Sequence, residues 1–164
     1  MLRAAATIWK IITDSKRSRE LSLSDICKEA IKLTVIGGIG YVLAIVFLIL
    51  EQQAPGGTQG MYVSLPLMVA LGLSAGVAIY TYARKAFIFF SNIDRIIDML
   101  KIFMVDIFAA IFIAVTNLCS QALKVDGSYV LDIGLGAHYI IAWLYHIYCR
   151  SAYKKGENEQ KGKK

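Results

Sequence analysis

Residues 102–123 read IFMVDIFAAIFIAVTNLCSQAL, an apolar stretch that carries a single carboxylate, Asp106. A helix needs about 20 apolar residues to cross the hydrocarbon core of a bilayer, and this stretch is long enough. A charged side chain at the bilayer centre costs about 2.5–3.5 kcal/mol on insertion scales. The position of Asp106 must therefore be explained by its depth in the membrane or by a partner on another helix.

Three further segments of the chain are similarly apolar. The chain has 164 residues, of which 57% are hydrophobic, and the apolar residues come in blocks rather than in stripes. Such blocks are typical of transmembrane helices. The sequence therefore predicts an all-α membrane protein whose membrane domain, 33–149, is a bundle of four transmembrane helices. The predicted spans are 33–50, 62–83, 102–123 and 129–149.

The basic residues predict the orientation of these spans. Seven Lys and Arg residues precede the first span, four lie between the second and third, six follow the fourth, and only Lys124 falls on the other side. Basic residues are enriched in cytoplasmic loops. We therefore expect both termini in the cytoplasm, loops 51–61 and 124–128 outside, and a location in a bacterial inner membrane. Contact with the lipid bilayer explains the net charge of +6 better than nucleic-acid binding does.

The residues outside the membrane domain divide into two parts. Residues 1–32 are predicted to be cytoplasmic, and their segment 2–14 has the spacing of an amphipathic helix that lies on the inner leaflet. The basic tail 150–164 is predicted to be disordered.

Two capping boxes predict where helices begin on the cytoplasmic side. Ser22 and Asp25 have the spacing of one box, and a helix from there would run into the first span. Ser91 and Asp94 form the second box, so the third helix is expected to begin near Asn92 and to project from the membrane.

Small residues mark faces on which helices can approach closely. In lipid, helix association depends on such faces and on polar contacts more than on the hydrophobic effect. Packing within the bundle is the first explanation of these faces and oligomerisation the second. The predicted packing positions are Gly37, Gly40 and Ala44 in the first span, Gly72 and Gly76 in the second, and Gly134 in the fourth.

The polar residues of 102–123 gather on one side of the helix, which should face the bundle interior. Asp106, Asn117 and Gln121 lie on that side at 100° per residue. In the fourth span, His146 lies at the depth of Asp106 and Asp132 at the depth of Gln121, while His138 lies near mid-membrane. The structural interpretation is a pair of polar clamps between the last two helices. The functional interpretation is a proton or ion path through Asp106, His138 and Asp132.

The sequence contains no pattern of a known catalytic, metal or cofactor site. It lacks GxSxG, HExxH, P-loop and CxxC motifs, and its three cysteines do not suggest a disulfide framework. We therefore expect no enzymatic activity, no cofactor and no metal, and we identify no small-molecule substrate.

Three functions are compatible with a small polytopic protein of this kind. The first is recognition of another integral membrane protein, or of a second copy, through helix faces, as in plasmid exclusion, immunity against pore-forming toxins, or the assembly of secretion and conjugation machines. The second is a small proton- or ion-coupled transporter or channel subunit. The third is a holin-like lysis protein. A solute path needs polar groups from several helices, and the first two spans contribute little beyond Ser74 and Thr81, which favours recognition.

Overall fold

The protein is built from four long helices, as a computed structural model of residues 21–53 and 58–161 describes it. Their bounds are α3 (Leu23–Gln52), α4 (Thr58–Ser91), α5 (Ile96–Leu123) and α6 (Ser128–Lys161), with a short 3₁₀ turn, η1 (Ile93–Arg95), before α5. All four are long and apolar enough to cross a membrane. The prediction of an all-α membrane protein with four spans is thus confirmed at the level of helix length and composition. The segment 2–14, which we expect to be amphipathic, lies outside the described residues.

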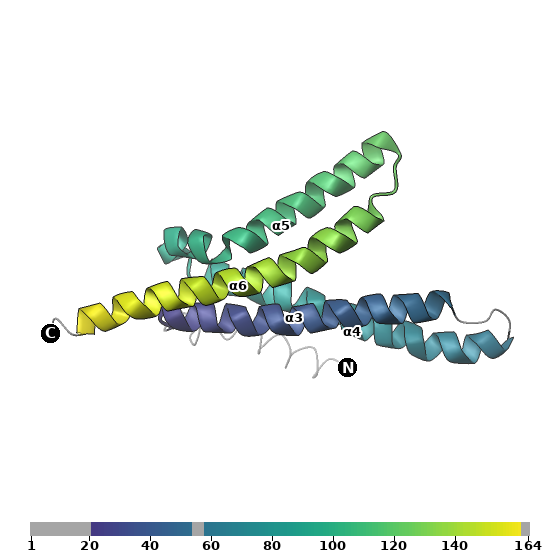
Figure 1. The fold of residues 1–164 in the computed structure, drawn as a ribbon, viewed down its shortest axis with the longest axis horizontal. Coiled ribbons are helices and arrows are strands. Elements are labelled where there is room, and N and C mark those ends of the chain that lie inside the picture. Colours follow the sequence, from purple (N-terminus) through teal and green to yellow (C-terminus); the bar gives the residue numbers. More distant parts are fainter. Residues whose placement is uncertain (1–20, 54–57, 162–164) are drawn as a thin grey trace.

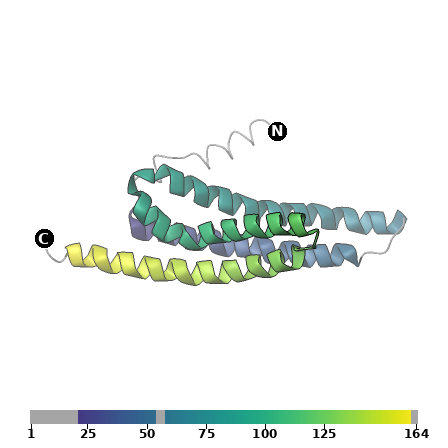
Figure 2. The same ribbon diagram turned by 90° about the horizontal axis from the view of Figure 1, so that it is seen from above.

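The helices form two antiparallel hairpins, α3–α4 and α5–α6 (Figure 1). Helix α3 packs along both α4 and α6, whereas α5 packs mainly on α6 and hardly touches α4. Figure 1 shows α5 leaning away from α3 and α4 towards the loops, and in Figure 2, seen from above, the four helices run roughly parallel. We call the end at which α3 begins and α4 ends the basic end, and the opposite end, with the two hairpin loops, the loop end.

The buried core lies at the basic end, where all four helices meet. Elsewhere, large apolar side chains are exposed along every helix, as expected for surfaces that face lipid. The first part of α5 is held in this core, but most large side chains in the rest of α5 are exposed. The buried core residues are Ile26, Cys27, Ala30, Leu33, Ile88, Met99, Ile102, Phe103 and Cys149.

The N-cap hydrogen bond of the first capping box forms as predicted, and that of the second does not. Ser22 precedes α3, and its hydroxyl oxygen accepts a hydrogen bond of 3.2 Å from the backbone N–H of Asp25. At the start of α5 no side chain caps the helix. There Asn92 is buried, and its side-chain amide donates to the carbonyl of Ile88 at 2.9 Å, so it closes the last turn of α4 rather than capping α5. Helix α5 consequently begins at Ile96 rather than near Asn92.

All four helices extend beyond the spans predicted from hydropathy, and α5 does so by the six residues 96–101. Helix α3 begins ten residues before position 33, α4 continues past 83 to Ser91, and α6 continues to Lys161. The expected disordered tail is therefore helical over 150–161. Hydropathy finds only the part of a helix that suits lipid, and it does not show where the hydrogen-bonded backbone ends.

The predicted glycine faces differ in what they contact. A Cβ at Gly40 would lie 2.9 Å from the carbonyl oxygen of Ser74, so α3 and α4 approach closely there. Gly37 faces Thr81 in the same interface, and Gly134 faces the ring of Phe112. Ala44, further along α3, is half-buried.

The glycines of the second span, in contrast, have open space beside them among the described residues. Within the described part of the chain, no neighbouring atom lies within 4 Å of a Cβ placed at Gly72 or Gly76. The packing inside the bundle that we expected at this GxxxG motif is thus not found. Their face of α4 is turned away from the other helices, and oligomerisation is the explanation of the motif that the geometry leaves open.

Candidate functional site

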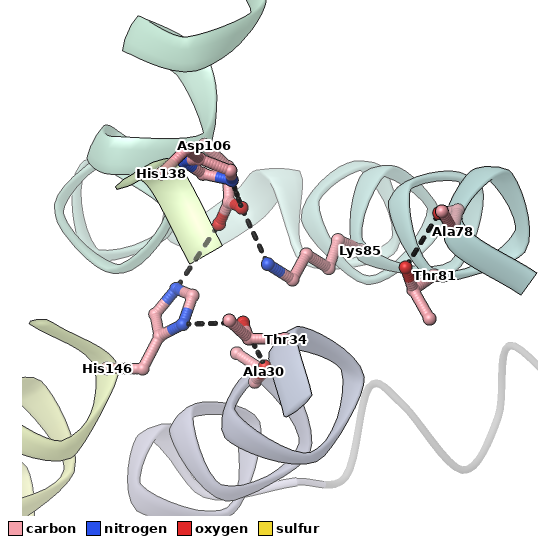
Figure 3. A network of polar contacts seen from close by, with 8 residues as sticks. All are labelled: Ala30, Thr34, Ala78, Thr81, Lys85, Asp106, His138 and His146. Atoms are coloured by element: carbon pink, nitrogen blue, oxygen red, sulfur yellow. Dashed lines mark hydrogen bonds and ion pairs between the residues drawn. The ribbon is translucent and has the colours of Figure 1, made fainter. Parts of the chain in front are cut away.

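One polar side chain from each of three helices and two from the fourth converge near the basic end. We call this group the Asp106 cluster. Its members are Thr34 of α3, Lys85 of α4, Asp106 of α5, and His138 and His146 of α6. Figure 3 shows Lys85 and the two imidazoles directed towards the carboxylate of Asp106. Asp106 is therefore accommodated in an apolar span because partners on two other helices surround its carboxylate.

The carboxylate lies close to three basic nitrogens. The ammonium nitrogen of Lys85 donates to Oδ1 of Asp106 at 2.6 Å. Nε2 of His138 lies 3.3 Å from the same oxygen, and Nε2 of His146 lies 3.2 Å from Oδ2. Asp106 thus has one short charge-assisted hydrogen bond and two imidazole neighbours at ion-pair distance.

The cluster is shielded from the surroundings. The exposed fraction of the side chain is 4% for Lys85, 10% for Asp106 and 0% for His146. Removing charges from water is costly, and a buried pair offsets that cost only while both partners remain. Lys85 and Asp106 therefore depend on each other inside the bundle.

Counting donors and acceptors indicates which atoms of the cluster could bind an additional proton. The hydroxyl of Thr34 donates its only proton to the carbonyl of Ala30 at 2.8 Å, and it lies 3.2 Å from Nδ1 of His146. In the arrangement in which this proton stays on the carbonyl of Ala30, the hydroxyl accepts from Nδ1–H of His146. In the neutral ring Nε2 then carries no hydrogen and faces Oδ2 of Asp106, so that two acceptors meet at 3.2 Å.

The geometry at these atoms agrees with an unfilled proton position. Among the described residues, neither Nε2 of His146 nor Oδ2 of Asp106 has a well-directed hydrogen-bond partner, and neither ring nitrogen of His138 has one. Buried polar atoms are nearly always hydrogen-bonded, so several unpartnered atoms around one carboxylate need a reason. One additional proton on an imidazole or on the carboxylate would turn an acceptor–acceptor contact into a hydrogen bond.

Aromatic rings form the walls of the cluster. Tyr82 stacks on His138 with ring centroids 5.8 Å apart, and Tyr139 lies 5.6 Å from the same imidazole. On the other side of the carboxylate, Phe103 meets His146 edge-on at 6.0 Å. These rings hold the imidazoles in place while leaving their nitrogens directed towards Asp106.

The other predicted polar contacts lie outside the cluster. Asn117, Gln121 and Asp132 are all exposed near the loop end, and none of their side chains bonds to another described residue. The main-chain carbonyl of Asp132, not its carboxylate, accepts a hydrogen bond from the hydroxyl of Tyr41. The expected outer clamp is thus not found, and Asp132 cannot share a proton path with Asp106 in this arrangement.

Sequence reasoning missed two members of the cluster. The second predicted span ends at residue 83 and leaves Lys85 outside it, and Thr34 lies within the apolar first span. The signal for Lys85 was present: Ala86, Phe87, Ile88, Phe89 and Phe90 follow it, so the basic pair at 84–85 interrupts an apolar helix rather than ending it. The depth predicted for Asp106 and His146 agrees with their 3.2 Å contact.

The described residues contain no group of three or more His, Cys, Asp or Glu that could hold a metal ion. Of the free cysteines, Cys27 and Cys149 are buried in the core, and Cys119 is exposed on α5. Comparison of the chain with protein-family models, with curated proteins and with solved structures found no match in any of the three. The chemistry that the geometry itself supports is proton exchange at Asp106 and its two imidazoles.

Proposed function

We propose that the protein is a proton-coupled membrane protein of the transporter or channel-subunit class, and that the Asp106 cluster is its proton site. The observation that carries this proposal is the buried contact of 3.2 Å between Nε2 of His146 and Oδ2 of Asp106, neither of which has a well-directed partner. An ionisable group within a membrane span is expected to be functional.

The charges of the cluster support proton exchange. With Lys85 charged, Asp106 ionised and both imidazoles neutral, the cluster is neutral overall. Histidine is the side chain that ordinarily changes its charge between about pH 5 and pH 8. A proton taken up by either imidazole would make the cluster positive and would weaken the hold of Lys85 on the carboxylate, because the carboxylate would then have two cationic partners.

The number of helices involved also favours this function over recognition alone. The sequence favours recognition because the first two spans contribute few polar groups, yet Thr34 of α3 and Lys85 of α4 both reach the cluster. A site shared by all four helices can couple a change of charge to their relative positions. A purely structural clamp would be expected to have its buried polar atoms paired.

Recognition of another membrane protein, or of a second copy, remains a second candidate, and two observations favour it. Asn117 and Gln121 are exposed on the outer part of α5 with no partner among the described residues, and Gly72 and Gly76 leave a smooth face on α4. Polar side chains and small-residue faces are the features through which membrane helices associate.

The proposal includes an orientation, namely both termini in the cytoplasm of a bacterial cell and the loop end outside. The support is the distribution of basic residues, of which only Lys124 falls at the loop end. The Asp106 cluster would then lie nearer to the cytoplasmic side of the inner membrane.

The test uses the two histidines as direct reporters. The chain has only 2 His residues, and both belong to the cluster. The full chain is labelled with ¹⁵N-histidine, purified through a tag without histidine, and placed in lipid nanodiscs for NMR between about pH 5 and pH 8. We expect at least one imidazole to gain a proton in this range, and we expect proteoliposomes to conduct protons.

Matched variants separate a proton site from a clamp. The double variant His138→Gln/His146→Gln keeps the Lys85–Asp106 pair and its charge balance but cannot bind the proton, so proton conduction should disappear while the protein remains folded. Asp132→Asn makes an equivalent change at an exposed position and should conduct like the wild type. Imidazoles that keep one protonation state throughout, together with proton conduction by the double variant, would refute the proposed function.

A further inference from the structure

A groove between α4 and α5 leads to the Asp106 cluster. It has a volume of about 340 Å³, and its walls include Phe89, Phe90, Phe103 and Ile107. Lys85 and Asp106 also line it, so a charged pair lies beside apolar and aromatic walls. Both helices are candidate spans that hardly touch each other, so in a bilayer a groove between them would open towards the hydrocarbon.

We propose that this groove binds a single-chain amphiphilic anion, with its carboxylate at Lys85 and its acyl chain along the aromatic wall. An ionised long-chain fatty acid has this chemistry. The inference rests on the proposed function, because it takes the cluster to be the proton site and names the class of substrate that the proton accompanies.

Charge complementarity selects an anion. The cluster holds one carboxylate against three basic side chains, namely Lys85, His138 and His146. Once an imidazole binds a proton, the cluster has an excess positive charge in a region of low dielectric constant. An anion in the groove would restore neutrality, whereas a cation would add a further like charge.

The depth of the site selects a small head group on one chain. Lys85 lies six residues before the end of α4, which is about 9 Å of helical rise. A fatty acid can reach this depth in its neutral, protonated form. A phospholipid phosphate keeps its charge and is held at the membrane surface by its hydration.

The proton balance of binding is simple. The neutral acid breaks its O–H bond and becomes a carboxylate that pairs with the ammonium of Lys85. The proton passes to a ring nitrogen of His138 or His146 by way of the carboxylate of Asp106, which contacts both rings. No other reactant is needed. The groups that face this exchange are Thr34 on α3, Tyr82 and Lys85 on α4, Asp106 on α5, and His138, Tyr139 and His146 on α6.

The binding test compares three probes of equal chain length. Radiolabelled palmitate, hexadecanol and hexadecyltrimethylammonium are titrated onto the full chain in nanodiscs, and binding to empty nanodiscs is subtracted. We expect palmitate to bind at least about tenfold more tightly than the neutral and the cationic probe, which is a difference of about 1.4 kcal/mol. Equal binding of the three probes, or a preference for hexadecanol or the cation, would overturn the inference.

A blocking variant locates the site without disturbing the charges. Ala110 lines the groove on α5, one turn beyond Asp106, so Ala110→Phe should fill the groove and lower palmitate affinity at least about tenfold. Ala114 is exposed one turn further along α5 and does not line this groove, so Ala114→Phe is the matched control with wild-type affinity. Palmitate binding that survives Ala110→Phe would place the ligand elsewhere and overturn the inference.

The failures of the two proposals are distinguishable. Imidazoles that titrate in a protein that does not bind palmitate would overturn the anion groove and leave the proton site standing. Palmitate binding by a protein whose imidazoles never change their protonation state would refute the proton site, and with it the claim that the anion accompanies a proton.

Discussion

Removing the carboxylate of Asp106 should destabilise the bundle strongly, because it leaves Lys85 buried without a counter-charge. The perturbation is Asp106→Leu, which replaces the carboxylate by an uncharged, apolar side chain on α5. The ammonium of Lys85 is 2.6 Å from the carboxylate, and the side chain is only 4% exposed. Neither solvent nor another carboxylate of the cluster is available to replace Asp106.

The size of the effect can be estimated from this geometry. Two unit charges at 2.6 Å attract each other by about 6 kcal/mol at an effective dielectric constant of about 20. The cost of removing both charges from water offsets part of that attraction, and breaking a buried pair from one side costs about 3–5 kcal/mol. We therefore expect Asp106→Leu to lower the free energy of unfolding by about 3–5 kcal/mol. The double variant Lys85→Met/Asp106→Leu removes both charges, so it should recover most of the loss.

The assay is reversible unfolding in mixed micelles, followed by circular dichroism as the fraction of SDS is raised. An exposed pair in the same chain provides the control. Lys32 and Glu29 lie 3.6 Å apart with side chains that are 58% and 37% exposed, so Glu29→Gln should cost no more than about 1 kcal/mol. The reasoning is refuted if Asp106→Leu costs no more than Glu29→Gln, or if the double variant is no more stable than Asp106→Leu alone.

Three other predictions address packing, hydrogen bonding and topology. Gly40→Ala should reduce thermal stability because its Cβ would lie 2.9 Å from a backbone oxygen, whereas Gly76→Ala has open space and should leave the melting temperature unchanged or raise it; equal losses would contradict this difference. Thr34→Val removes the hydroxyl that fixes His146, so the ¹⁵N chemical shifts of that ring should change while far-UV circular dichroism does not; unchanged shifts would mean that the hydroxyl does not set the tautomer. In a cysteine-free background, Val125→Cys should be labelled by an impermeant maleimide from outside intact cells and Glu159→Cys should not, and the reverse pattern would invert the proposed orientation.

Hydropathy was sufficient to predict the helices, because lipid imposes one requirement on every span. A long apolar run and a helix of at least about 20 residues are nearly the same feature in a membrane. The short connection after Lys124 likewise determines the α5–α6 hairpin. The helix ends could not be predicted in this way. Helix α6, for example, continues to Lys161 through polar residues, which can form helical hydrogen bonds but are not apolar enough to be recognised as part of a span.

For the Asp106 cluster, the sequence could predict only the depth of each residue along the membrane normal. Helical rise gives the depth of each residue, and it correctly placed His146 beside Asp106. It does not give the rotation of one helix relative to another, so it could not show that Lys85 points at the same carboxylate. His138 was placed at another depth because residues eight apart differ by about 12 Å in rise. The two imidazoles nevertheless both reach the carboxylate, which lies between them.

The unknown rotation of each helix also explains why the packing of the glycine faces could not be predicted. A GxxxG pattern states that one face of a helix is smooth, but a contact also requires a neighbour on that face. Gly40 has such a neighbour in α4, whereas Gly76 has none among the described residues, although both lie on small-residue faces predicted from the sequence. Which smooth faces meet is decided by loop lengths and by polar contacts elsewhere in the bundle.

The position of α5 connects the cluster with the groove. Helix α5 hardly packs on α4, so the hydrogen bond between Lys85 and Asp106 is a principal link between these helices along the groove. A proton on His138 or His146 gives the carboxylate a second cationic partner on α6 and reduces its attraction for Lys85. The proposed proton would thus favour the α5–α6 contact over the α4–α5 contact and release Lys85 to an anion in the groove. The charge state of two imidazoles would in this way decide whether Lys85 pairs with the protein or with its ligand.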